Sequence, residues 1–367
     1  MKYSDTINTV NKQRGILTES NIMEFWALKA CNFKCGYCGL VETGEINDNS
    51  HILFYKDKQN REKIARFFTN NKPCGRNWAV MLTGGEPFLL PEIDDLVNRI
   101  AFGGNTICFY TNNSIPVSKI LSNSALRHVQ YIQASFHPDW HMAAREKTTF
   151  FDNVELIKAQ GVPVLVRFVG SVFLLPLLPE LSRICEEIGV CFYVTACFDE
   201  KYPENYTPEE RAELASYMGG YSSLLQLDGG VDMRGRICQA GSRLFATRFH
   251  DNFNVSPCIT IGTPIIGNIL DDWLSPYSGG VSCLNNNILC TCDIHFQQGI
   301  VSGVDDSHNY EQQLNGFTTS VVDTYDTWKN NHNIKTKTGI HVQGANVHTK
   351  AGLVKKMNRT IASFFGR

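Results

Sequence analysis

The sequence predicts an α/β fold in which a partial (β/α)6 barrel, similar in plan to a TIM barrel, is followed by a small cysteine-rich domain. Six strand-like apolar runs alternate with helix-like segments over residues 22–196, a pattern typical of βαβ units with a parallel sheet. Polar and glycine-rich motifs follow the first four runs, at the strand ends where such sheets carry their chemistry. A second group of cysteines lies downstream of the alternating pattern.

The expected strands and helices follow one another in order along this part of the chain. Thr207 followed by Pro-Glu-Glu is typical of a helix N-cap, and Gly161 and Gly189 suit positions that end helices. The predicted strands are Ile22–Leu28, Trp78–Leu82, Thr106–Thr111, Val129–Phe136, Val162–Val169 and Cys191–Ala196. The predicted helices are Arg61–Asn70, Pro91–Ile100, Pro116–Leu121, Phe150–Gln160, Pro179–Ile188 and Thr207–Met218.

Length, composition and charge narrow the class of protein. The 367 residues, of which 43% are hydrophobic and 19% charged, suit one large globular domain with a smaller one. The formal net charge of -2 does not favour a nucleic-acid partner, because such proteins normally carry a basic field. No apolar stretch approaches the ~20 residues that span a bilayer, so the sequence predicts a cytoplasmic protein without a membrane partner.

These observations divide the chain into four expected parts. Residues 1–20 form an N-terminal segment, residues 21–232 the partial barrel, residues 233–303 the domain with the second cysteine group, and residues 304–367 a C-terminal extension. From Thr327 to Arg367 this extension has lysines and arginines but no Asp or Glu, so we expect a basic tail.

The first cysteine group, Cys31, Cys35 and Cys38, lies directly after the first predicted strand. In a reducing compartment, thirteen cysteines are more typical of metal ligands than of a disulfide framework. Thiolates at these spacings can converge on tetrahedral zinc or on an iron–sulfur cluster. Three protein ligands favour a cluster that keeps one iron for an exogenous ligand, and a zinc site with a distant fourth ligand is the alternative.

The stretch Cys31-Asn-Phe-Lys-Cys35-Gly-Tyr37-Cys38 resembles the CxxxCxxC signature of the radical S-adenosylmethionine (SAM) superfamily, which has an aromatic residue before its last cysteine. The resemblance implies that the partial barrel is a radical SAM core. It also implies a [4Fe-4S] cluster on the three cysteines, with SAM at the open iron and Tyr37 near the adenine. Reduction of the cluster would cleave SAM to methionine and a 5′-deoxyadenosyl radical, which abstracts hydrogen from a substrate.

The second predicted strand is followed by Gly84, Gly85, Glu86 and Pro87, a stretch similar to the family's GGEP motif. The resemblance implies that this motif holds the methionine ammonium group of SAM. Its chemistry fits that role, because paired glycines permit close approach of the backbone and a carboxylate accepts from an ammonium ion.

The fourth predicted strand carries further residues that the resemblance assigns to SAM. Ser135 and Arg145 match a serine and an arginine that bind the SAM carboxylate in the sulfatase-maturase branch. This chain reads Ser-Phe-His-Pro where that branch commonly has Ser-hydrophobic-Asp-Gly, and His137 either faces the substrate or has a backbone partner, the second being favoured. Asn112, at the end of the third strand, completes the cofactor-binding candidates, and no catalytic acid or base is identified.

The second cysteine group resembles the cluster-binding extension called SPASM, or its shorter form, Twitch. The framing residues are Cys238-Gln-Ala-Gly, Asn254-Val-Ser-Pro-Cys258 and Ile266-Gly-Asn-Ile. The resemblance implies one auxiliary iron–sulfur cluster, expected to be [4Fe-4S], and four thiolates on zinc are the alternative. The expected ligands are Cys238, Cys258, Cys290 and Cys292, with Cys283 as a substitute, whereas Cys74, Cys108, Cys185 and Cys191 are expected to be small buried residues.

Taken together, the motifs predict a radical SAM enzyme that oxidises, rearranges or crosslinks a peptide or a sugar-like small molecule, aided by the auxiliary cluster. A flavodoxin or a ferredoxin is the expected electron donor. The alternative class is a zinc-stabilised binding or scaffold protein without catalytic activity.

Overall fold

The computed structural model describes residues 19–141, 144–197, 205–218, 220–259, 262–283, 289–291, 299–304 and 320–337. Within these ranges, the side chains of residues 144–146 and 320–324 are not described. Two of the candidate ligand groups, Cys292 and the side chain of Arg145, therefore lie outside the description, as does most of the basic tail.

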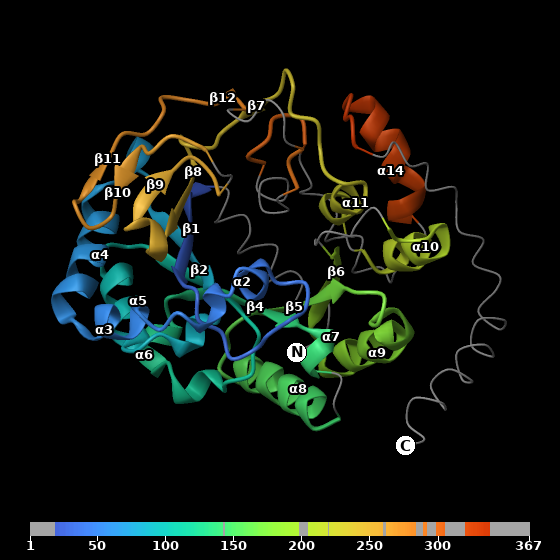
Figure 1. The fold of residues 1–367 in the computed structure, drawn as a ribbon, viewed down its shortest axis with the longest axis horizontal. Helices are drawn as coiled ribbons and strands as arrows, with labels where there is room; N and C mark the ends of the chain where they lie inside the picture. Colours follow the sequence, from blue (N-terminus) through green and yellow to red (C-terminus); the bar gives the residue numbers. More distant parts are fainter. Residues whose placement is uncertain are drawn as a thin grey trace.

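One sheet of ten strands organises the chain (Figure 1). Its order from edge to edge is β11-β10-β9-β8-β1-β2-β3-β4-β5-β6, and β1 to β6 pair in parallel with their chain neighbours. These six are β1 (Asn21–Leu28), β2 (Trp78–Gly84), β3 (Thr106–Thr111), β4 (Val129–Phe136), β5 (Val164–Gly170) and β6 (Cys191–Ala196). They confirm the α/β class and the six predicted strands, whose ends differ from the prediction by at most two residues.

The later part of the chain extends the same sheet. β8 (Leu244–Arg248) pairs in parallel with β1, which places seven parallel strands side by side where the sequence predicted six. β9 (Asn254–Ser256), β10 (Gly267–Asn268) and β11 (Trp273–Leu274) follow in antiparallel pairing. The sheet stays open, because β6 and β11 form its two edges.

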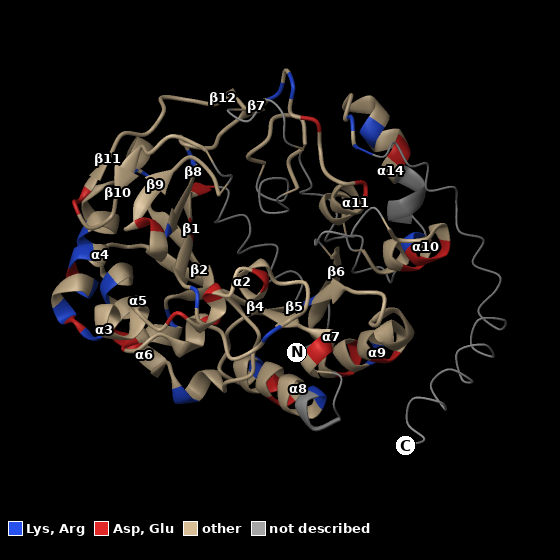
Figure 2. Cartoon of the chain, viewed as in Figure 1, with Lys and Arg blue, Asp and Glu red and all other residues tan. Residues whose placement is uncertain are grey.

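Helices cover one face of the parallel strands. Phe25 on β1 lies 6.3 Å from Phe68 of α4 (Lys58–Asn70), and Phe136 on β4 lies 5.2 Å from Phe150 of α8 (Ala144–Ala159), measured between ring centroids. Figure 2 shows charged residues on the outer helices and mostly uncharged residues on the strands. The other helices are α2 (Gly39–Glu42), α3 (His51–Lys56), α5 (Ile93–Phe102), α6 (Asn123–Leu126), α7 (Pro138–His141), α9 (Leu178–Ile188), α10 (Pro208–Tyr217), α11 (Tyr221–Leu227) and α14 (Ser320–Asn331).

The local signals identified five of the six expected helices. The helix predicted over Pro116–Leu121 is wrong: only a 3-10 turn forms at Val117–Lys119, because the backbone leaves helical geometry at Ile120, with φ -120° and ψ -41°. Thr207 is the N-cap of α10 in a complete capping box, and Gly189 ends α9 in the left-handed conformation with φ 65°. Both caps are as predicted.

Three of the four cysteines expected to be buried packing residues are buried. Cys108, Cys185 and Cys191 are at most 1% exposed. Cys74 is exposed instead, because it sits in a 3-10 turn with a left-handed backbone, φ 54°, rather than in a helix or strand.

The other, inner face of the parallel strands carries polar and aromatic side chains. The Tyr110 and Tyr131 hydroxyl oxygens lie 3.1 Å apart, and the Tyr193 hydroxyl donates to Gln133 Oε1 at 2.7 Å. Successive side chains of a strand point to opposite faces, so these residues alternate with the apolar ones that pack under the helices. Hydrogen-bonding groups therefore line the side of the sheet away from the helices.

Residues 205–243 carry the chain from β6 back to β8. Within this segment, the short strand β7 (Ile237–Cys238) pairs antiparallel with β12 (Val281–Ser282). Tyr221 of α11 stacks on Trp328 of α14, with ring centroids 4.3 Å apart, so the last described helix packs on the crossing segment. Among the described helices, none combines the length and apolar character needed to cross a bilayer.

Candidate cofactor site at the strand ends

The first cysteine group forms a short loop at the carboxyl end of β1. The Cys38 N–H donates to the Cys35 carbonyl at 3.0 Å, which closes a turn, and Cys38 then becomes the N-cap of α2. Cys35 is 5% exposed, whereas Cys31 and Cys38 are half-buried. The three thiols thus belong to one compact loop that is still open to solvent.

Burial controls the acidity of two of these thiols. Burial raises the pKa of Cys31 to about 11. The hydrogen bond from the Phe33 N–H to the Cys31 sulfur has the opposite, smaller effect on this pKa. Burial also raises the pKa of Cys35 to about 12. The charges of neighbouring cysteines in the loop also raise the pKa of both thiols, by less than burial does. They are protonated at neutral pH, so a metal group that binds them must displace their protons.

The GGEP turn lies against the start of the cysteine loop. A Cβ on Gly84 would be 2.2 Å from the Leu28 carbonyl oxygen, and one on Gly85 would be 1.9 Å from the Ala30 carbonyl oxygen. Gly84 also has φ +130°, which L side chains rarely adopt. The two glycines are required by the approach of this turn to the backbone that enters the cysteine loop.

Glu86 is fully buried behind this turn and has three protein partners. Its carboxylate accepts from the Phe88 N–H at 2.9 Å, the Thr111 hydroxyl at 2.7 Å and the Asn112 N–H at 2.7 Å. Burial raises the pKa of Glu86 to about 7, and these hydrogen bonds oppose the rise. In this structure the carboxylate joins the ends of β2 and β3.

Asn112 links the end of β3 to the cysteine loop. Its side-chain amide donates to Asn32 Oδ1 at 2.9 Å, and its Nδ2 lies 3.7 Å from Cys31 Sγ. The Ser114 hydroxyl donates to Asn112 Oδ1 at 2.6 Å and fixes the orientation of the amide. The structure therefore brings this predicted residue to the thiols.

The short helix α7, with His137 before it, contacts several residues of the loop. The Tyr37 hydroxyl and His137 Nδ1 are 2.7 Å apart, and the Gly36 N–H donates to Asp139 Oδ2 at 2.9 Å. The Phe33 and Trp140 rings stack with centroids 5.0 Å apart. Asp139 and Trp140 were not candidates from the sequence, although they follow Ser135 closely. His137 has a side-chain partner instead of the expected backbone partner.

The structure describes the side chain of Ser135 but not that of Arg145. Ser135 is half-buried at the end of β4 and lies in register with Arg167 on β5, which the sequence analysis missed. Arg145 falls in α8, with its side chain outside the described residues. Arg167 Nε donates to Thr195 Oγ1 at 3.0 Å. Burial, with a smaller contribution from the charge of Arg167, lowers the pKa of His137 to about 4.

The second cysteine group is only partly described. Cys238 on β7 is buried and pairs with Val281, two residues before Cys283. Cys290 exchanges backbone hydrogen bonds of 2.8 and 2.9 Å with Val231, and Cys258 follows β9. Within the described ranges, no three Cys, His, Asp or Glu side chains are close enough together to hold one metal ion. An iron–sulfur cluster needs its thiolates farther apart than a single metal ion does, because each thiolate binds a different iron.

The fold and the first cysteine loop define a class: α/β proteins in which parallel-strand ends present a three-thiol loop beside a glycine turn. Residues 28–187 match the model described as the Radical SAM superfamily. A match to that model implies a [4Fe-4S] cluster and SAM for this part of the chain. The cysteine loop supplies soft thiol donors that suit such a cluster.

Known proteins resemble this chain in sequence or in fold. A GTP 3',8-cyclase from Nostoc punctiforme is 34% identical over 113 residues, which are 30% of this chain and 33% of that protein. The chain therefore matches about a third of the length of this curated relative. A solved structure, native anSMEcpe with bound AdoMet, has a TM-score of 0.50 and 14% identity over 85% of this chain and 99% of that chain. Streptococcus suis SuiB has a TM-score of 0.48 and 16% identity, over 71% of this chain and 65% of that chain.

Proposed function

We propose that this protein is a radical SAM enzyme that cleaves SAM reductively and abstracts hydrogen from a peptide or a sugar-like small molecule. The net reaction would be an oxidation, a rearrangement or a crosslinking of that substrate. The observation that carries the proposal is the three-cysteine loop at the carboxyl end of β1, inside the segment that matches the superfamily. The match to the cyclase covers 113 residues and supports the class without choosing a substrate.

In this proposal, Cys31, Cys35 and Cys38 hold the cluster. When bound and reduced, that cluster supplies the electron that splits SAM into methionine and a 5′-deoxyadenosyl radical. The protein residues hold the loop in place, since Asp139 accepts from the Gly36 N–H at 2.9 Å. Orientation and exclusion of water are the contributions that a protein makes to cofactor chemistry.

The SAM contacts remain those that the motifs predict. Tyr37 would lie beside the adenine, with its hydroxyl turned to His137. In the GGEP turn, Gly84, Gly85, Glu86 and Pro87 would line the methionine end, and the buried Glu86 would act by fixing the turn and Asn112. Ser135 and Arg145 would bind the carboxylate.

We further propose one auxiliary [4Fe-4S] cluster in the second cysteine group, on four of Cys238, Cys258, Cys283, Cys290 and Cys292. The support is the resemblance of the sequence to SPASM and Twitch extensions. This cluster would take up an electron, anchor the substrate or serve the fold. A flavodoxin or ferredoxin would reduce the enzyme. The enzyme would be located in the cytoplasm.

A comparison of two cysteine variants tests both cluster assignments. The protein is purified and reconstituted without oxygen, and its iron, sulfide and zinc are measured together with reductant-dependent formation of 5′-deoxyadenosine from SAM. Cys35→Ala should lose that formation, because Cys35 is the most buried thiol of the loop. Cys258→Ala should keep part of it and bind less iron than the wild type.

Each variant is the control for the other, since each should spare the other cluster. Cleavage of SAM that survives in Cys35→Ala would defeat the assignment of the first cluster. Unchanged iron in Cys258→Ala would remove the auxiliary cluster. A colourless wild-type protein with stoichiometric zinc and no iron would support the scaffold class instead.

A further inference from the structure

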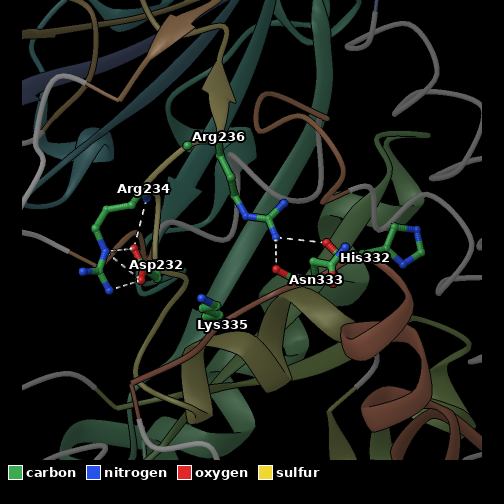
Figure 3. Close-up of a pocket in the computed structure, with 7 residues that line it drawn as sticks. Asp232, Arg234, Arg236, His332, Asn333 and Lys335 are labelled. Carbon is green, nitrogen blue, oxygen red and sulfur yellow. Dashed lines mark hydrogen bonds and ion pairs between the residues drawn. The ribbon is translucent and has the colours of Figure 1, made fainter.

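A pocket of about 500 Å³ lies between the loop before β7 and the segment after α14 (Figure 3). The loop contributes residues 232 and 234–236, and the C-terminal segment contributes residues 332, 333 and 335. The pocket has no part in the cysteine-loop site. Its lining carries three cations, Arg234, Arg236 and Lys335, against one carboxylate, Asp232.

The single carboxylate forms hydrogen bonds with one of the three cations and interacts with the other two through charge alone. Asp232 accepts from Arg234 Nε at 2.9 Å and from its NH2 at 2.5 Å, and also from the Arg234 backbone N–H at 3.0 Å. This arginine lowers the pKa of Asp232 to about 2, so the pair is ionised at neutral pH. The two charges offset each other, and Arg236 and Lys335 are left to set the sign of the pocket.

Arg236 is held in place by neutral groups. Its NH2 donates to the His332 carbonyl at 3.0 Å and to the Asn333 carbonyl at 2.6 Å, both just beyond the end of α14. These carbonyls orient the guanidinium without cancelling its charge. In Figure 3, Lys335 lies between this guanidinium and the Arg234–Asp232 pair. The three cations and one carboxylate give the lining a formal net charge of +2.

Arg236 and Lys335, the two cations outside the Arg234–Asp232 pair, give this concave surface a positive charge. Charges of one sign around a concave surface add to its potential and raise the local concentration of oppositely charged ligands. An oxyanion is therefore the chemical group that this pocket fits.

The position of the pocket limits the size of its ligand. In Figure 1, β7 and α14 are well separated from α2, which directly follows the cysteine loop. A ligand with one end in this pocket and a reacting carbon near that loop must be extended. This requirement favours a peptide with acidic side chains over a small phosphate ester.

We propose that this pocket binds acidic side chains of a peptide substrate, outside the reaction site. The inference rests on the proposed radical SAM function and chooses the peptide class of substrate. Arg236 and Lys335 would bind the carboxylates, and the neutralised Arg234 would form the rim.

The test measures binding of a fluorescein-labelled hexaglutamate peptide to the reconstituted full-length protein by fluorescence anisotropy. Lys335→Glu reverses the charge of an exposed side chain, so the fold should tolerate it. Its dissociation constant should rise by roughly fivefold or more, the size expected when a partly exposed attraction becomes a repulsion. Lys63→Glu on α4 makes the same change of net charge at an exposed site outside the pocket and should have little effect.

Three results would overturn the proposal: an equal loss of affinity in both variants, no loss in Lys335→Glu, or displacement of the probe by pyrophosphate at lower concentration than by unlabelled hexaglutamate. The last result would indicate a phosphate ligand. Basal 5′-deoxyadenosine formation without peptide separates this inference from the proposed function. Lys335→Glu should keep that formation, whereas its absence from the wild type would count against the radical SAM chemistry itself.

Discussion

At the scale of single residues, Glu86 links three parts of the candidate site. It accepts from Phe88 in its own turn and from Thr111 and Asn112 at the end of β3. Asn112 in turn donates to Asn32 of the cysteine loop at 2.9 Å. One buried carboxylate therefore determines how the glycine turn, the third strand and the thiol loop lie relative to one another.

Glu86→Gln should destabilise the fold. The amide replaces one acceptor oxygen by an NH2 group, which then faces a donor in a site that is fully buried. An unmet buried hydrogen-bonding group costs about 1–3 kcal/mol, so we expect a loss of that size in the free energy of unfolding, measured in urea. Glu42→Gln, at an exposed position in α2, is the matched control. Equal stabilities of the two variants would show that the three hydrogen bonds contribute nothing.

At the scale of elements, α7 shows how a four-residue helix can hold a functional loop. The segment from His137 to His141 contacts the loop through the Tyr37 hydroxyl, the Gly36 N–H and the Phe33 ring. His141 stabilises the start of this segment, because its Nδ1 accepts from the His137 N–H at 2.9 Å. The His141 side chain is buried, with 1% exposed. The loop therefore depends on a buried histidine that does not touch the thiols through a hydrogen bond.

This burial should make the fold sensitive to acid. Desolvation, with a smaller effect of His137, lowers the pKa of His141 to about 3, below its usual 6.5. Between pH 6.5 and 3, His141 is protonated in the unfolded chain but neutral in the folded chain. The folded state therefore loses stability as the pH falls from 6.5 toward 3, and this loss is absent well above pH 6.5. Between pH 6.5 and 5 the expected loss is ~2 kcal/mol.

Urea unfolding at pH 7 and pH 5 measures this loss. In His141→Gln, which keeps an acceptor for the His137 N–H, the difference between the two pH values should shrink by about that amount. His332→Gln substitutes an exposed histidine and serves as the control. An unchanged pH difference in His141→Gln would assign the acid sensitivity to other groups.

At the scale of the whole molecule, the sequence predicted what local pattern determines. The six strands are runs of apolar residues and the three thiols lie within eight positions, so both are readable from short windows. The place of β8 beside β1 and the docking of α14 were not predicted, because they depend on partners far away in the chain. For the same reason, the sequence did not indicate Arg167 or Asp139 as site residues. The position of Arg167 follows from strand register, and that of Asp139 from a contact with Gly36, 103 residues away in the chain.

The docking of α14 depends on Asp228, a buried carboxylate just beyond α11. It accepts from Lys329 Nζ at 3.0 Å and from the Tyr325 hydroxyl at 2.9 Å, both on α14, and from Arg211 of α10 at 3.3 Å. The carboxylate side chain is 2% exposed, and those of Arg211 and Lys329 are 8% and 9% exposed. Three helices therefore meet at one negative charge that two buried cations share.

Asp228→Asn should release α14 and weaken the whole fold. Removing one partner of a buried ion pair typically costs about 3–5 kcal/mol, because the remaining charge is left buried without a counter-charge. Here two cations would be left, so we expect a loss of at least that order in urea unfolding, together with faster tryptic cleavage after Lys329. Glu187→Gln, which breaks an ion pair with both side chains 59% exposed, should change neither. If Asp228→Asn unfolds like Glu187→Gln and resists trypsin as well as the wild type does, then packing of Tyr221 on Trp328 is sufficient to hold α14. The buried charges are then not what joins α14 to α10 and α11.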